Sequence, residues 1–246
     1  MTGEETQMER YRLSFTVGGL LVPQSVITAR VFLETVENAQ KNEPVALMEA
    51  LTATSDAKKR SLGALWKAAR RQVIDESLLP IRTQSAMSRT VSEVIKRLET
   101  LSPTELRFLT ADDSMNADRA ALMWVAMCRY YTLVGEFANG VLRDHYLLGK
   151  PTVTYDDYDR FAYSKSLWHA ELDEISPATA KKLRANLFQA MFEGRLLEKE
   201  GNLIVPSLLG SRLTDVLRKK PESFLFFPMR DQAQSGNGNI DIQRTD

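Results

Sequence analysis

The stretch from Ser176 to Val205 constrains the fold more than any other part of the chain, because a strong helix start is followed by a strong turn. Its sequence is SPATAKKLRANLFQAMFEGRLLEKEGNLIV. The Ser176 hydroxyl can accept a hydrogen bond from a free N–H of the first helical turn, and Pro177 fits the first helical position, where no N–H is needed. Apolar residues then recur at spacings of three and four as far as Gly194, which predicts an amphipathic helix.

The residues after this helix predict a small β-hairpin. The runs 196–199 (LLEK) and 203–205 (LIV) are β-prone, and 200–202 (EGN) is a turn sequence between them. A helix with a polar outer face followed by a hairpin is the order found in winged-helix DNA-binding domains, and base edges in the major groove require polar donors. An ordinary amphipathic helix that carries Lys and Arg on its wet side fits the same pattern.

The composition leaves nucleic-acid binding open. The chain has 246 residues, 43% of them hydrophobic and 26% charged, which is ordinary for a globular protein with one large core or two modest ones. Its formal net charge is zero. Any basic surface therefore has to be local and offset elsewhere on the molecule.

A reducing, cytoplasmic environment is expected. Cys128 is the one cysteine, so no intrachain disulfide can form. The N-terminal sequence MTGEETQMER lacks the apolar core of a secretory signal. The most apolar run, Ala120 to Val134, is interrupted by Arg129 and is shorter than the roughly 18 residues that a membrane span requires. We expect this run to be a buried core helix and the protein to have no membrane role.

Two consecutive segments of the first half predict a basic helix, a turn and a second helix. The first, Asp56 to Glu76 (DAKKRSLGALWKAARRQVIDE), carries six cations in about four turns, against a single early acid, Asp56. These cations are Lys58, Lys59, Arg60, Lys67, Arg70 and Arg71. Such a density suits phosphates, because each neutralised phosphate releases condensed counterions. Pairing with acidic residues of the same fold is an equal alternative.

The second segment runs from Arg82 to Leu98 (RTQSAMSRTVSEVIKRL), and Thr83 or Ser85 can cap its helix. Small hydroxyls and arginines at a helix start suit close approach to a DNA backbone. The pair of segments therefore resembles a second DNA-reading unit. In the alternative interpretation, Ser and Thr are caps and nothing more.

The remaining signals divide the chain into an arm, two domains and a tail. Aromatic and Met residues between 117 and 148 predict a packed hub, and Gly149-Lys150-Pro151 marks a boundary. The expected parts are an N-terminal arm (1–22), an N-terminal helical domain (23–150), a C-terminal winged-helix-like domain (151–230) and a disordered tail (231–246). The expected fold class is mainly α, a helical bundle with two helix-turn-helix-like units, the C-terminal one bearing a small β-hairpin wing.

Nothing in the sequence predicts catalysis. His145 and His169 stand outside any zinc motif, and Cys128 lies in the most apolar segment. The acids between Asp156 and Asp159 lack the pattern of a calcium loop and complement a helix start instead. Nucleophile-elbow, phosphate-loop and kinase motifs are absent from the sequence. We expect a binding protein rather than an enzyme, with no metal, no cofactor and no small-molecule substrate.

Four segments of the chain resemble the BrxA family of the BREX bacteriophage-exclusion systems. They are YRLSFTVGGLLVPQS from Tyr11, RTQSAMSR from Arg82 with Arg97-Leu98, the stretch Trp124 to Arg129, and Trp168-His169 with Ile175-Ser176-Pro177 and Lys182-Leu183-Arg184. The similarity spans most of the chain, from about Tyr11 to Phe227. It implies an all-helical, cytoplasmic phage-defence protein that binds double-stranded DNA through helix-turn-helix elements. The operons of the family also encode a DNA adenine methyltransferase, an ATPase and an alkaline-phosphatase-like protein, so the resemblance implies these as partners.

The sequence prediction is binding of double-stranded DNA, largely through phosphates and with weak or no sequence specificity. Helix geometry nominates as DNA-binding residues Arg82, Thr83, Ser85, Ser88, Arg89, Ser92, Lys96, Lys181, Lys182, Arg184, Asn186, Gln189, Arg195 and Lys199, and the six cations of 56–76 as additional phosphate contacts. Among them Ser88, Ser92, Asn186 and Gln189 are expected to approach bases. Two alternatives are a protein–protein scaffold within the defence complex and a helical RNA-binding protein.

Overall fold

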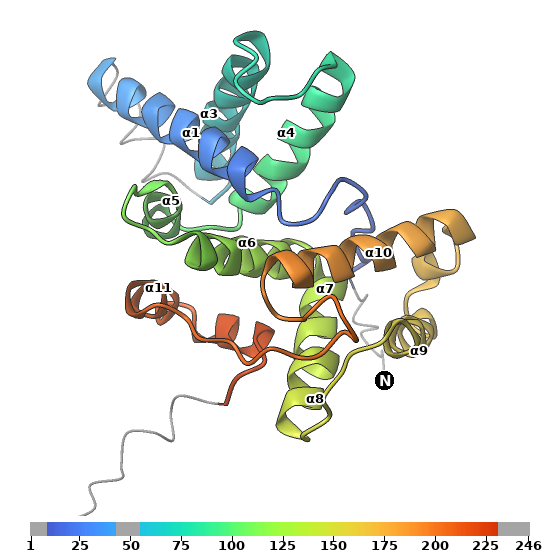
Figure 1. The fold of residues 1–246 in the computed structure, drawn as a ribbon. Helices are drawn as coiled ribbons and strands as arrows, with labels where there is room; N and C mark the ends of the chain where they lie inside the picture. The colour runs from blue at the N-terminus through green and yellow to red at the C-terminus, as the bar shows by residue number, and fades with distance from the viewer. Residues whose placement is uncertain (1–8, 43–54, 231–246) are drawn as a thin grey trace, which may run out of the picture.

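The computed structural model describes residues 9–42 and 55–230, and within these ranges the protein is built from helices (Figure 1). The mainly α fold class predicted from the sequence is confirmed. No strand or sheet is present in the described ranges, where β-pairing is confined to two isolated bridges.

The first part of the fold consists of α1 (Val22–Asn42), α3 (Ser55–Asp75) and α4 (Gln84–Leu98), which pack against one another pairwise. The ring of Phe32 on α1 stacks on Trp66 of α3, with centroids 3.6 Å apart. Thr83 caps α4, because its hydroxyl accepts from the Ala86 N–H. The predicted succession of helix, turn and helix is therefore present, and α1 supports both of its helices.

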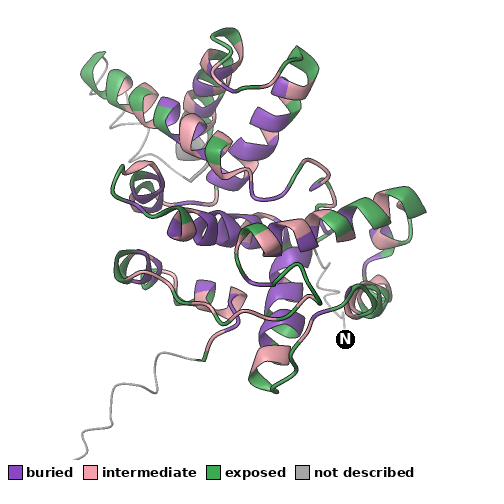
Figure 2. Cartoon of the chain, in the orientation of Figure 1, coloured by how far each residue is buried: buried purple, intermediate pink, exposed green. Residues whose placement is uncertain are grey.

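The middle of the chain forms the hub. It comprises α5 (Pro103–Thr110), α6 (Asn116–Tyr130), α7 (Thr132–Phe137), a π-helical stretch η1 (Ala138–Arg143) and α8 (Asp144–Leu147). Every residue from Ala120 to Cys128 is buried, so α6 is enclosed on all sides, as Figure 2 shows in purple. Within the described ranges no helix combines the length and the apolarity needed to cross a membrane.

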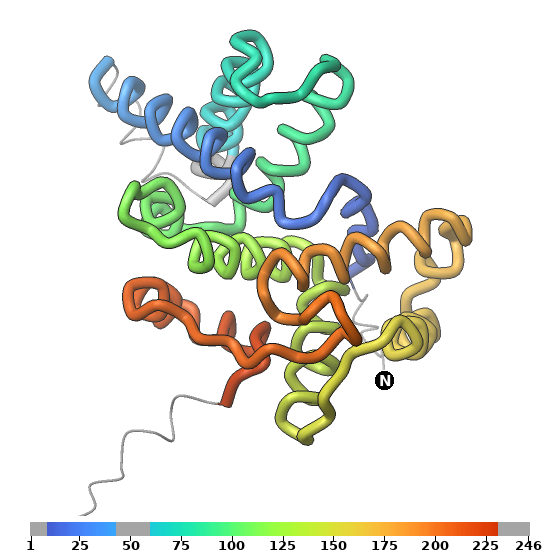
Figure 3. Tube along the Cα trace, in the orientation of Figure 1, coloured from blue at the N-terminus to red at the C-terminus, as the bar shows by residue number. Residues whose placement is uncertain are grey.

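The last part contains α9 (Tyr155–Ser166), the 3₁₀ turn η2 (Ala170–Leu172), α10 (Pro177–Glu193), α11 (Ser211–Leu217) and η3 (Pro221–Phe226). The start of α10 is the one predicted, since the Ser176 hydroxyl accepts from the Thr179 N–H and Pro177 opens the helix. After α10 the chain doubles back along α6 to α11, a path that Figure 3 traces. Trp124 Nε1 donates to the Phe226 carbonyl at 2.8 Å and so ties this last segment to the hub.

The predicted β-hairpin wing is wrong. Where two strands were expected, Leu197 and Ile204 form a single bridge pair. The turn between them exists, with Gly201 and Asn202 in the left-handed region at φ values of 77° and 52°. Leu196 and Leu197 are both buried although they are consecutive, whereas side chains of a strand alternate between two faces. Residues 196–204 therefore form an irregular loop whose first two leucines pack into the core.

The far side of this loop is attached to the boundary segment that precedes α9. The Val153 N–H donates to the Asn202 carbonyl at 3.2 Å, and the Ile204 N–H donates to the Pro151 carbonyl at 2.8 Å. Thr152 and Leu203 form the second isolated bridge. Backbone groups that a free-standing wing would present to solvent or DNA are used inside the protein.

The N-terminal arm, residues 9–21, lies between α4 and α10 (Figure 1, dark blue). Its carbonyl at Gly19 accepts from Arg97 Nη1 at 2.6 Å, and its N–H at Leu20 donates to Glu193 Oε2 at 2.6 Å. Phe15 and Leu20 are fully buried. The arm is thus a core element that joins the first helices to α10.

Candidate nucleic-acid interface

One face of α3 carries a row of exposed cations. Arg60, Lys67 and Arg71 are seven and four positions apart, a spacing that places them on the same side of a helix. All three are exposed, and none makes a hydrogen bond or ion pair with a described residue. Small Ala64 and Ala68 are exposed between them, so an extended anion can approach the helix closely.

Arg70 is one position away from this row and points to α4 instead. Its Nη2 donates to the Ser88 hydroxyl at 2.6 Å and its Nε to the Ser92 hydroxyl at 3.2 Å. The Ser92 hydroxyl donates in turn to the Ser88 carbonyl at 2.7 Å. These three nominated residues, all half-buried, hold α3 and α4 together.

The start of α4 adds two more exposed cations, Arg82 and Arg89, and neither faces a carboxylate among the described residues. Arg89 Nε donates to the Ser85 carbonyl at 3.3 Å, which leaves the rest of its guanidinium free. We name Arg60, Lys67, Arg71, Arg82 and Arg89 the α3–α4 basic face. Lys96, further along α4, lies instead near Glu93 at 3.7 Å and the Ser14 hydroxyl at 3.3 Å. The side chains of Lys58 and Lys59 lie outside the described residues.

The polar side of α10 is used largely within the protein. Asn186 Nδ2 donates to the Phe15 carbonyl of the arm at 2.9 Å, and Gln189 Nε2 donates to Glu193 Oε1 at 2.8 Å. Arg184 is paired with Asp159 and lies over a tyrosine ring. Asn186, Gln189 and Arg184 were predicted from the sequence to contact DNA, and all three have partners within the protein.

Four further nominated cations, Lys181, Lys182, Arg195 and Lys199, are exposed and make no ion pair with a described residue. The two lysines lie at the N-terminal half of α10, whereas Arg195 and Lys199 follow its C-terminal end. These cations are spread along the element, so they form a looser group than the α3–α4 basic face.

The side chains of His169 and Cys128 are both buried. The ring of His169 stacks on Tyr11 with centroids 3.7 Å apart, and its Nδ1 lies 3.0 Å from Glu171 Oε1. Burial raises the pKa of the Cys128 thiol well above its ordinary value. In the described ranges, no three His, Cys, Asp or Glu side chains gather to hold a metal ion.

The sequence reasoning missed an exposed apolar group at the end of α9, formed by Tyr163, Leu167 and Trp168. Tyr158 and Phe161 of this helix pack inward on Phe137. Tyr163 and Leu167, four positions apart, fall on a different side of the helix. A helical projection of α9 from the sequence would have separated the two sets.

Comparison with known proteins supplies the family. The BrxA family model matches residues 56–221, from α3 to the start of η3. No curated protein shows significant similarity to the chain. The crystal structure of an uncharacterized protein from Magnetospirillum magneticum is similar with a TM-score of 0.64 at 18% identity, over 88% of this chain and 96% of that one, which shows a shared fold. Because the family model covers well over half of its length, the chain belongs to the BrxA family.

Proposed function

We propose that the protein binds double-stranded DNA as a component of a BREX phage-defence system, and that the duplex contacts the α3–α4 basic face. Membership of the BrxA family implies a BREX component. The other proteins of such a system, among them its methyltransferase, ATPase and phosphatase-like protein, are the proposed protein partners. We propose that the chain acts by binding and not by catalysis, in keeping with its buried His169 and Cys128.

One observation carries the proposal. Three exposed cations lie on one side of α3 and two more lie just before and within the first turns of α4, which packs on α3, and none of the five has a carboxylate partner among the described residues. The chain as a whole is neutral, so this concentration is not a by-product of a basic composition. Lys and Arg that meet phosphates release condensed counterions, which is the main source of affinity in non-specific DNA binding.

Weak sequence specificity follows from where the neutral polar groups lie. Bases are read by hydroxyls, amides and guanidinium groups that reach base edges. The hydroxyls of Ser88 and Ser92 bind Arg70, and the amide of Asn186 binds the arm. We propose that the remaining exposed cations contact phosphates, and phosphate contacts carry no sequence information.

A salt titration of duplex binding tests the proposal. The variant Lys67→Ala/Arg71→Ala/Arg89→Ala should bind two unrelated fluorescent duplexes more weakly by similar factors. Its plot of log K against log salt concentration should be flatter by about two to three units, since each lost phosphate contact removes about 0.9. Fluorescence anisotropy over a range of salt concentrations measures both quantities.

The matched control removes three exposed cations elsewhere that form no ion pair with a described residue, in the variant Arg107→Ala/Lys219→Ala/Arg230→Ala. Its slope should equal that of the wild type. An unchanged slope in the first variant, or no duplex binding by the wild type at low salt, contradicts the proposal. Stronger competition by single-stranded or looped RNA than by duplex DNA would favour the RNA-binding alternative.

A further inference from the structure

Arg70 of α3 binds two side chains of α4 at once. Its Nη2 and Nε, which form one edge of the planar guanidinium, donate to the hydroxyls of Ser88 at 2.6 Å and Ser92 at 3.2 Å. The two serines are four positions apart and therefore lie on the same side of α4. The Ser92 hydroxyl donates to the Ser88 carbonyl at 2.7 Å, which fixes its own orientation. We name these three side chains the Arg70 clamp.

The clamp lies among the cations of the α3–α4 basic face. On α3, Arg71 directly follows Arg70 and Lys67 precedes it by three positions. On α4, Arg89 directly follows Ser88. Each of these exposed cations therefore stands on a helix turn that the clamp holds. The separation between the α3 cations and Arg89 is set by the clamp together with the packing of α4 on α3.

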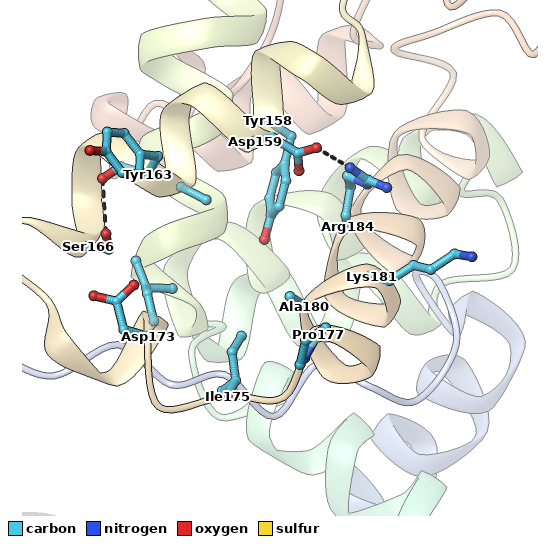
Figure 4. Close-up of a pocket in the computed structure, with 12 residues that line it drawn as sticks. Tyr158, Asp159, Tyr163, Ser166, Asp173, Ile175, Pro177, Ala180, Lys181 and Arg184 are labelled. Atoms are coloured by element: carbon cyan, nitrogen blue, oxygen red, sulfur yellow. Dashed lines mark hydrogen bonds and ion pairs between the residues drawn. The ribbon is translucent and has the colours of Figure 1, made fainter.

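The clamp adds no negative charge to this face. Serine hydroxyls are neutral, and Arg70 has no carboxylate partner among the described residues. Arg184 of α10 is held in the opposite way, because its guanidinium pairs with the carboxylate of Asp159 on α9 (Figure 4). A carboxylate in place of the serines would also join α3 to α4, but it would cancel part of the attraction for an anion. A clamp of hydroxyls fixes the two helices and leaves the face positive.

We infer that Arg70 is a positioning residue of this face and that the clamp makes the face prefer duplex DNA to single strands. The inference rests on the function proposed above. A duplex is stiff, with a persistence length of about 50 nm, so its phosphates keep fixed separations and are bound best by cations that are already held at matching positions. A single strand has a flexible backbone and adjusts to the cations instead. Arg70 therefore acts through Lys67, Arg71 and Arg89, and its own guanidinium does not contact a phosphate.

Two variants loosen the clamp and leave the number of cations unchanged. Arg70→Lys keeps the charge but lacks the planar pair of donors, and Ser88→Ala/Ser92→Ala removes both acceptors. Each should weaken the binding of two unrelated duplexes by the same factor, about three- to tenfold, while the affinity for a single strand of equal length stays unchanged. The slope of log K against log salt concentration should equal that of the wild type, because no phosphate contact is lost. Fluorescence anisotropy measures both affinities and the slope.

Two further proteins serve as controls. When Arg70→Lys and the two serine changes are combined, duplex binding should weaken no more than with either change alone, because both remove the same clamp. Ser114→Ala removes a buried hydroxyl that donates to the Phe108 carbonyl at 2.7 Å in the hub, and it should leave the ratio of duplex to single-strand affinity unchanged. Near-ultraviolet circular dichroism establishes that each variant is folded before binding is measured.

Several results would overturn the inference. Full duplex affinity of Arg70→Lys, together with a slope that is flatter by about 0.9 in Arg70→Ala, would mean that Arg70 contacts a phosphate directly. Equal losses for duplex and single strand would mean that the clamp only supports the fold. Losses that differ between the two duplexes would mean that Ser88 and Ser92 read bases. A wild type that binds duplex DNA no better than its clamp variants removes this inference alone, whereas a wild type without duplex binding removes the proposed function as well.

Discussion

Glu105 shows how much structure one side chain can organise in this protein. Its carboxylate accepts from Arg129 at 2.8 and 3.0 Å and from the Ser102 N–H at 2.7 Å, and Arg129 also donates to the Ser223 hydroxyl at 2.8 Å. The start of α5, the end of α6 and η3 therefore meet at one buried ion pair. A buried pair of this kind is costly to break, because the remaining charge is left without a partner.

The free energy of unfolding should depend on pH through the titration of the Glu105 carboxylate. Burial alone raises the pKa of Glu105, but the hydrogen bonds from Arg129 and Ser102 outweigh it and leave the pKa below its ordinary value of 4.5. At neutral pH, Glu105→Gln should lower the free energy of unfolding by about 3–5 kcal/mol. The part of this difference that comes from the lowered pKa should be present above pH 4.5 and should be lost as the pH falls through the lower folded value, where the wild type also loses its charge.

Urea denaturation at a series of pH values measures this difference. Glutamine can still accept from the helix start, so the variant isolates the charge. The exposed Glu222→Gln on η3 is the matched control and should change stability by less than about 0.5 kcal/mol. A Glu105→Gln effect that stays constant down to acidic pH would contradict the pKa argument.

At the scale of helices and loops, the N-terminal arm occupies polar side chains of α10. The Leu20 N–H and the Phe15 carbonyl both bind side chains of α10, and Phe15 packs on Tyr131 with ring centroids 5.0 Å apart. Asn186 is consequently a structural donor. A helix whose polar amides are already bonded has fewer groups left to offer a ligand.

Phe15→Ala should loosen the arm. Removal of a fully buried ring costs about 3–5 kcal/mol, and part of that loss should appear as local opening of residues 9–21. Hydrogen exchange should then show faster exchange of the Leu20 amide than of amides in α6. Glu9→Ala, which removes an exposed ion pair with Arg12 within the same arm, should leave exchange unchanged. Equal acceleration throughout the molecule would mean that the arm does not open separately.

The sequence predicted features that are determined over a few residues. The caps at Thr83 and Ser176 depend on a hydroxyl and an N–H three positions later, and the periodicity of the α3 cations depends on helix geometry. Arg70 was nominated together with Arg71, from which it is turned by about 100° around the helix. The sequence does not show that α4 packs on the side to which Arg70 points, so Arg70 was expected to face outward.

Features that join distant parts of the chain were not predictable in the same way. The partner of Asn186 lies 171 positions away in sequence, and nothing near Asn186 indicates it. The loop after α10 has the turn residues of a hairpin, but the burial of both Leu196 and Leu197 is decided by the core around them. Local propensity is overridden where tertiary packing determines the backbone.

At the scale of the whole molecule, α6 is the element around which both halves are assembled. Sequence signals at Gly149-Lys150-Pro151 predicted a domain boundary, yet contacts cross it. Trp124 is bonded to Phe226, and Arg97 is bonded to the arm that also meets α10. From these contacts we predict that the parts before and after this boundary unfold together.

A chain that ends at residue 150 should therefore fail to fold cooperatively. It would expose the side of α6 that α10 and η3 cover, including Trp124. We expect a broad urea transition and a weak near-ultraviolet circular dichroism signal, in contrast to a single coincident transition of the full chain by both near- and far-ultraviolet signals. A sharp transition of the shortened chain would show that residues 1–150 form an independent domain.

The bond between the Leu20 N–H and the Glu193 carboxylate has a consequence for synthesis of the protein. These partners are 173 positions apart, so the ribosome releases the arm long before its binding site has been made. At translation rates of about 5–20 residues per second, the interval lasts on the order of ten seconds or more. Helices α1, α3 and α4 emerge early and can pack locally, whereas the bonds of the arm to Glu193 and Asn186 cannot form before α10 has been made. During that time the arm of the nascent chain is a short apolar segment without these partners, and chaperones bind segments of this kind.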